Sequence, residues 1–150
     1  MVKTIGKNFD QFAVLGLGRF GSEIAVALAG GGKEVLAVDI AEDRVQAISS
    51  LVTHAVTADA ADEHVLKAIE IFSFDAVVVA IGDIQASVLA TVTLKEMGAK
   101  YIVAKASNDK HKRVLEKIGA DYVLVPEAEM AQKLANRLMN KRLNDLMEVN

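Results

Sequence analysis

The residues best suited to chemistry lie near the N-terminus, in a turn that contains three closely spaced glycines. The stretch AVLGLGRFGSEIA, residues 13–25, places Gly16, Gly18 and Gly21 in the G-x-G-x-x-G spacing, between an expected strand and an expected helix. The first glycine permits a tight turn, the second lets phosphate oxygens approach the main chain, and the third lets the helix pack closely on the strand. The free N–H groups of the helix then face the anion. The spacing therefore indicates a site for a phosphate-bearing ligand.

Arg19 directly follows the second glycine, where the helix is expected to begin. A cation is unfavourable beside the positive N-terminal end of a helix. A guanidinium, however, can hold phosphate oxygens through two hydrogen bonds. The position therefore favours a contact with phosphate over the alternative, an exposed residue that only starts the helix.

Asp39 supplies the acidic partner that such a turn needs, about 20 residues further along the chain. It ends the second expected strand, and its carboxylate can accept hydrogen bonds from ribose hydroxyls. Its charge would repel a 2′-phosphate, which argues against NADP. The alternative is a glycine turn that only packs a helix on a sheet, and it leaves the acid unexplained. The combination favours binding of an adenine nucleotide.

Further candidates follow three later strands at their carboxyl ends, where open α/β sheets bind ligands. Asp59 ends the third strand and Lys105 the fifth, while the fourth ends in Ala80, Ile81, Gly82 and Asp83. Asp59 is equally well explained as a turn or helix-capping residue. Lys105 is also explained as a solvated lysine, although its place at a strand tip favours an anion contact.

The three histidines give little support to an enzyme. His54 is expected at a strand edge and His64 on a solvated helix face. His111 lies early in a helix on the ligand side, and it either reaches phosphate or ribose or is simply exposed. No His and carboxylate cluster has metal-site spacing, there is no cysteine, and neither a G-x-S-x-G elbow nor a P-loop is present. A binding module without turnover fits these residues better.

Alternating strands and helices along the whole chain must position these residues. Strands are expected at 12–16, 34–39, 53–59, 75–82, 100–106 and 121–126, with helices between them, including one around 62–71. Such alternation predicts βαβ units and a parallel sheet, and the continuous Val, Ile, Leu and Ala runs indicate a sheet covered on both faces. The predicted fold class is α/β, a doubly wound, Rossmann-like sheet of six parallel strands with a long C-terminal helix.

Composition narrows the classes of protein further. The 150 residues suffice for one domain with a substantial core. The net charge of −3 and the lack of a basic run argue against nucleic-acid binding. The N-terminal residues are too polar for a signal peptide, and no apolar run approaches the ~20 residues that span a bilayer. We expect a cytoplasmic domain that reaches a membrane only through a partner.

Several stretches together resemble one family of proteins. They are FAVLGLGRFG, VLAVD, HAVTADAADE, VVVAIGDIQAS, VLEKIGAD and the PE after the sixth strand. Over roughly residues 9–147 the sequence is similar to the N-terminal domain of RCK (KTN) proteins, and most like the cytosolic regulatory subunits of Ktr- and Trk-type potassium uptake systems. The resemblance implies a non-enzymatic domain that binds ATP, ADP or NAD(H). It also implies homodimers, larger rings such as octamers, and a membrane-embedded potassium-translocating partner at the inner face of the cell membrane.

The resemblance also implies roles for single residues. Arg19 is expected beside the terminal phosphates of ATP, near the dimer contact, where it can distinguish ATP from ADP. Glu127 is expected near the phosphates, with a divalent cation such as Mg²⁺, although complementing a helix dipole also explains this glutamate. The expected nucleotide-contacting residues are Gly16, Gly18, Arg19, Phe20, Gly21, Asp39, Ile40, Ala41, Asp59, Ala60, Ile81, Gly82, Asp83, Lys105, Ala106, Ser107, His111 and Glu127.

The last expected helix, residues 127–150, follows a core of strands and helices over about 9–126. Its first turns suit packing against the sheet, whereas its residues beyond about 140 have no expected cover within one chain, which favours a C2 dimer. Its apolar positions are Ala131, Leu134, Ala135, Leu138, Met139, Leu143, Leu146 and Met147. Family members continue into a smaller C-terminal lobe, which is not expected within these residues.

Two other functions stay open at this point. An NAD-dependent oxidoreductase, or a fragment of one, would prefer NAD(H) and transfer hydride, but the six strands leave no room for a substrate domain. A dimerisation module that binds no nucleotide leaves Asp39 and the glycine turn unexplained. The sequence does not separate ATP from NADH as the ligand, because both contain adenosine and a pyrophosphate.

Overall fold

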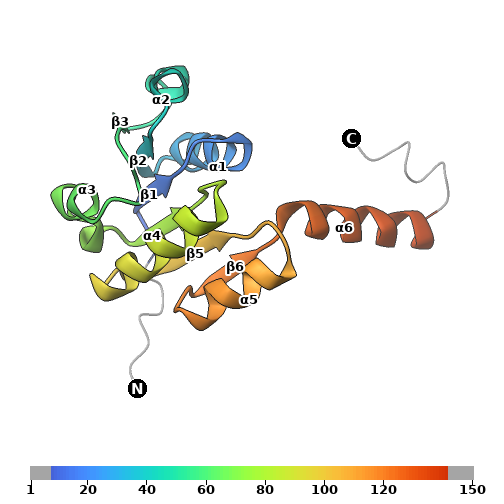
Figure 1. The fold of residues 1–150 in the computed structure, drawn as a ribbon. Helices are drawn as coiled ribbons and strands as arrows, with labels where there is room; N and C mark the ends of the chain where they lie inside the picture. Colours follow the sequence, from blue (N-terminus) through green and yellow to red (C-terminus); the bar gives the residue numbers. More distant parts are fainter. Residues whose placement is uncertain (1–7, 142–150) are drawn as a thin grey trace.

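The computed structural model describes residues 8–141 (Figure 1), in which strands and helices alternate as expected. In chain order the elements are β1 (Gln11–Leu15), α1 (Arg19–Gly30), β2 (Glu34–Asp39), α2 (Glu42–Ile48), β3 (His54–Thr57), α3 (Glu63–Ala68), the 3-10 turn η1 (Ile71–Ser73), β4 (Ala76–Val79), α4 (Ile84–Glu96), β5 (Ile102–Lys105), α5 (Asp109–Lys117), β6 (Tyr122–Leu124) and α6 (Pro126–Asn140).

The strands form one six-stranded sheet in the order β3-β2-β1-β4-β5-β6, and every neighbouring pair is parallel. This confirms the predicted doubly wound α/β fold. The strand order reverses between β1 and β4, where Val14 pairs with Ala37 on one side and Val78 on the other. Ligands of such sheets bind at the carboxyl ends of the strands beside this reversal.

The two faces of the sheet carry separate apolar clusters. Ala13 and Leu15 of β1 face a cluster that also contains Leu66 of α3 and residues of α4 and α5. Val14 faces the opposite way, into a cluster with Ala25 of α1 and residues of α2. Figure 1 shows the corresponding helices on the two sides of the sheet. Cover on both faces explains why β1 and β4 read as continuous apolar runs.

Four strands (β3, β4, β5 and β6) and one helix are shorter than the sequence predicted, and β3 and β4 differ most at their carboxyl ends. The strands expected at 53–59 and 75–82 end at Thr57 and Val79, because the residues that follow turn away to form loops at the edge of the sheet. The helix expected around 62–71 stops at Ala68. Glu70 then adopts a left-handed conformation, with φ of 55°, before the 3-10 turn.

The last helix differs most from expectation. The sequence predicts it over residues 127–150, whereas α6 begins at Pro126 and ends at Asn140, and Lys141 has extended backbone angles. The predicted packing of its first turns against the sheet is wrong, since no residue of α6 is buried, and Figure 1 shows the helix projecting from the body. Met130 and Leu134 are 71% and 55% exposed. Leu143, Leu146 and Met147 lie outside the described residues.

A second apolar surface lies on the α1 side of the sheet, over β4, β5 and β6. It is a groove of about 270 Å³ that we call the sheet groove. Its lining residues are Phe9, Phe12, Phe20, Ile24, Leu28, Ala76, Val78, Tyr101, Val103, Tyr122 and Leu124. Within residues 8–141, none of the helices combines the length and the apolar character needed to cross a lipid bilayer.

Candidate functional site

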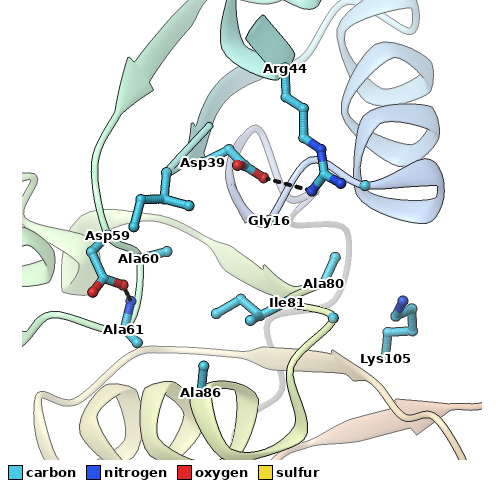
Figure 2. Close-up of a pocket in the computed structure, with 13 residues that line it drawn as sticks. Gly16, Asp39, Arg44, Asp59, Ala60, Ala61, Ala80, Ile81, Ala86 and Lys105 are labelled. Atoms are coloured by element: carbon cyan, nitrogen blue, oxygen red, sulfur yellow. Dashed lines mark hydrogen bonds and ion pairs between the residues drawn. The ribbon is translucent and has the colours of Figure 1, made fainter. Parts of the chain in front are cut away.

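A cleft of about 260 Å³ opens at the carboxyl ends of the strands, beside the reversal between β1 and β4 (Figure 2). The glycine turn and Asp39 form one wall, Asp59 and its neighbours a second, and Ile81 lies between them. Its lining residues are Gly16, Gly18, Asp39, Ile40, Arg44, Asp59, Ala60, Ala61, Ala80, Ile81, Gly82, Ala86 and Lys105.

The three glycines of the turn serve different purposes. Gly16 has a φ of +98°, and a Cβ there would lie 2.6 Å from the carbonyl oxygen of Ala80. A Cβ on Gly21 would overlap the carbonyl oxygen of Gly16, so the helix packs too closely for any side chain. Gly18 has an ordinary φ of −69°, and a Cβ there would meet nothing within 4 Å. Packing within the protein therefore excludes a side chain at positions 16 and 21. At Gly18, by contrast, the space that a side chain would occupy is open and belongs to the cleft.

Helix α1 begins directly after Gly18 without a side-chain cap and without an acidic residue in its first turn. Its N-terminal N–H groups and its dipole are therefore suited to an anion. Arg19 is exposed and does not line the cleft. Phe20 lies in the sheet groove and packs against the apolar cluster on that side, contrary to its expected place at the ligand.

Asp39 connects β2 to the glycine turn through its buried carboxylate. Oδ2 accepts a hydrogen bond of 2.6 Å from the N–H of Leu17, and Oδ1 accepts one of 2.8 Å from the N–H of Ala41. The guanidinium of Arg44 lies on the cleft side, with Nη1 3.7 Å from Oδ2 (Figure 2). Ala41 thus contributes its main chain to Asp39 and does not itself line the cleft.

Two further aspartates, Asp59 and Asp83, follow β3 and β4, and only Asp59 lines the cleft. Asp59 lines the cleft and also accepts a 2.9 Å hydrogen bond from the N–H of Ala61, so it is both a turn residue and a cleft residue. Asp83 differs from its expected role because it caps α4, accepting a 2.8 Å hydrogen bond from the N–H of Ala86, and does not line the cleft. Ile81 and Gly82, which precede it, do line the cleft.

His111 is neither exposed nor in the cleft, which contradicts both sequence interpretations. It is 3% exposed, and its Nδ1 accepts a 3.0 Å hydrogen bond from the N–H of Ser107. Its Nε2 lies 3.1 Å from Oγ of Ser87. Because Nδ1 is an acceptor, the proton of the neutral ring resides on Nε2 and is donated to Ser87. Burial lowers the pKa of His111, and the positive charge of Lys105 lowers it further, so both favour the neutral ring.

The structure thus brings half of the expected ligand residues together. Those that line the cleft are Gly16, Gly18, Asp39, Ile40, Asp59, Ala60, Ile81, Gly82 and Lys105. Those that do not are Arg19, Phe20, Gly21, Ala41, Asp83, Ala106, Ser107, His111 and Glu127. Glu127 is exposed in the first turn of α6, and across residues 8–141 no cluster of three or more His, Asp or Glu side chains is placed to hold a metal ion.

Sequence reasoning missed Arg44, Ala61 and Ala86, which also line the cleft. Arg44 carried a usable signal, since it is a cation in the first turn of a helix, as Arg19 is, and follows the acidic residue at the strand end. Ala61 and Ala86 carried none, because an alanine in a turn or a first helical turn has no distinguishing chemistry.

The arrangement of turn, acid and strand order matches a known family. The TrkA-N domain model covers residues 12–126 of the chain. The chain belongs to the TrkA-N family. The resemblance noted from the sequence is thereby confirmed at the level of the family.

One curated relative of this TrkA-N domain is the Ktr system potassium uptake protein C of Bacillus subtilis (strain 168), to which it is 48% identical over 140 residues. The match covers 93% of this chain and 63% of the relative, so the chain spans less than two thirds of that protein.

Two solved structures share the TrkA-N fold at low sequence identity. The Shewanella denitrificans Kef C-terminal domain in its AMP-bound form has a TM-score of 0.74 at 20% identity, covering 88% of this chain and 82% of the other. The GsuK channel bound to NAD has a TM-score of 0.69 at 14% identity, covering 79% and 22%. These likenesses concern the fold alone.

Proposed function

We propose that this TrkA-N domain is the nucleotide-sensing part of a regulatory subunit of a potassium uptake system, and that it has no catalytic activity of its own. The observation that carries the proposal is the cleft in which Gly18 leaves space over the start of α1 while Asp39 lies beside it. The 48% identity to a Ktr potassium uptake protein supports the transport context.

The cleft offers each part of an adenine nucleotide a suitable surface. Asp39 supplies carboxylate oxygens for ribose hydroxyls, and Ile40 supplies an exposed apolar side chain for the base. The space at Gly18 and the start of α1 suits phosphates, with Lys105 across the cleft. Binding of AMP by the Kef domain and of NAD by GsuK, which share this fold, supports an adenine nucleotide as ligand. We propose ATP and ADP as the ligands that regulate the domain, with NAD(H) as the alternative.

We also propose that the domain, with its core over about 9–126, works as a homodimer in a larger ring beneath a membrane-embedded partner. Helix α6 carries exposed apolar residues, and the sheet groove is an apolar surface on the same chain. Within residues 8–141 nothing covers either surface, and both would be buried if α6 of one copy packed into the groove of another. Sedimentation velocity should give a dimer at micromolar concentration, and a monomer at every concentration would contradict this assembly.

Arg19 provides the test of ATP sensing. Its exposed position at the start of α1, outside the cleft of its own chain, suits the terminal phosphates of a nucleotide near the dimer contact. We expect Arg19→Ala to weaken ATP binding by about tenfold, the effect of losing a charge-assisted hydrogen bond, and ADP binding much less. Titration calorimetry with ATP, ADP, NAD and NADH, with and without Mg²⁺, measures this directly.

Arg113→Ala is the matched control, since Arg113 is an exposed arginine on α5 that does not line the cleft. If Arg19→Ala lowered the affinities for ATP and ADP by equal factors, sensing of the γ-phosphate would be contradicted. Binding of NADH well above ATP, with no effect of Arg19→Ala, would favour a redox-nucleotide sensor. Measurable hydride transfer would support the oxidoreductase alternative. A Mg²⁺ dependence that Glu127→Gln removes would support a cation beside Glu127.

A further inference from the structure

Arg44 adds a cation to the cleft at the end where Asp39 lies. It belongs to the first turn of α2, and its guanidinium reaches the Asp39 carboxylate above the Gly16 turn (Figure 2). The Arg44 side chain is 57% exposed, whereas that of Asp39 is 6% exposed. The 3.7 Å separation is longer than a hydrogen bond, so the pair is loose and Arg44 can leave without breaking a directed contact.

The buried Asp39 carboxylate has hydrogen-bond donors besides Arg44. The N–H groups of Leu17 and Ala41 each donate to one of its two oxygens. Each carboxylate oxygen retains capacity for a further hydrogen bond. Arg44 lies at Oδ2, one of the two oxygens that a ribose diol would use. A bound ribose and the guanidinium therefore compete for the same oxygen.

The stability of α2 gives no reason for an arginine at this position. A cation in the first turn faces the positive end of the helix dipole, which is unfavourable. Glu42 and Asp43 already supply the negative charges that this turn favours. The placement of Arg44 is therefore better explained by an anion that enters the cleft.

We propose that nucleotide binding makes Arg44 exchange partners, from Asp39 in the free domain to the phosphate nearest the ribose in the complex. The proposal rests on the proposed binding of an adenine nucleotide. The ribose hydroxyls take the Asp39 oxygens, and the released guanidinium turns to the phosphate held above Gly18 at the start of α1. Arg44 is then the residue that selects 5′-phosphorylated nucleosides over adenosine, while Lys105 holds the phosphates from across the cleft.

The exchange makes opposite predictions for adenosine and AMP. Arg44→Gln should weaken AMP binding by about tenfold, because a charge-assisted hydrogen bond is lost. The same substitution should leave adenosine binding unchanged or make it several-fold tighter, because the competitor for Asp39 is removed. Titration calorimetry of the 150-residue chain measures the affinity for AMP, and displacement of bound AMP measures the affinity for adenosine. Arg113→Gln, on α5, is the matched control.

Asp39→Asn provides a second, independent arm. In that background Arg44 has no carboxylate to leave. A further Arg44→Gln change should therefore still weaken the binding of AMP but should no longer tighten the binding of adenosine. If Arg44→Gln lowered the affinities for adenosine and AMP equally, the proposal would be overturned, and the result would indicate that Arg44 stacks on the base. An unchanged AMP affinity would overturn it as well. If the wild-type chain binds neither AMP nor ADP, the proposed function itself fails, whatever Arg44 does.

Discussion

Gly21→Ala should destabilise the domain by about 3 kcal/mol or more, because a methyl group there overlaps the carbonyl oxygen of Gly16. The overlap is with main chain in a turn that also packs against Ala80, so neither side can move without disturbing the sheet. Urea denaturation monitored by circular dichroism gives the free energy of unfolding. We expect the nucleotide cleft to be lost with the packing of α1.

Gly18→Ala is the matched variant that separates packing from binding. A Cβ at Gly18 meets nothing within 4 Å, and its φ of −69° suits alanine. We therefore expect a loss of stability of about 1 kcal/mol or less, from the poorer helix cap. Nucleotide affinity should fall at least tenfold if phosphate approaches the main chain at this point. A Gly21→Ala protein as stable as wild type would refute the packing argument, and full affinity in Gly18→Ala would refute the phosphate site.

Asp39→Ala should lower both stability and nucleotide affinity. The N–H groups of Leu17 and Ala41 lose their acceptor, and each unsatisfied group costs about 1–3 kcal/mol. The free energy of unfolding should therefore fall by about 2–6 kcal/mol. Binding of adenosine and of AMP should become undetectable by calorimetry, because the ribose hydroxyls lose their acceptor and the glycine turn loses its anchor.

Two variants separate these effects of Asp39. Asp39→Asn keeps one carbonyl oxygen and should cost about half as much stability, since one N–H regains an acceptor. Asp59→Asn changes another aspartate of the cleft, one that is exposed and holds only the N–H of Ala61, and should leave stability nearly unchanged. An Asp39→Ala protein with wild-type stability would show that the carboxylate does not hold the turn.

The fold and most of the residues that line the cleft could be predicted from the sequence because their signals are local. Continuous apolar runs mark strands that are buried on both faces. The glycine spacing together with Asp39 fixes where the first strand turns into its helix, and a parallel sheet brings its carboxyl ends to one edge. Asp59, Ile81 and Lys105 follow from that rule, since each lies at or just after the end of a strand.

Only the tertiary structure decided where several side chains lie. The buried ring of His111 has partners for both nitrogens: the N–H of Ser107, four residues before it, donates to Nδ1, and Oγ of Ser87, on another helix, lies within hydrogen-bond distance of Nε2. Phe20 turns from the cleft into the sheet groove, because its face of α1 packs against the sheet. A helical residue can point to the ligand or to the core, and the packing of the whole sheet settles which. Arg44 enters the cleft for the same reason, because α2 packs with that side towards Asp39.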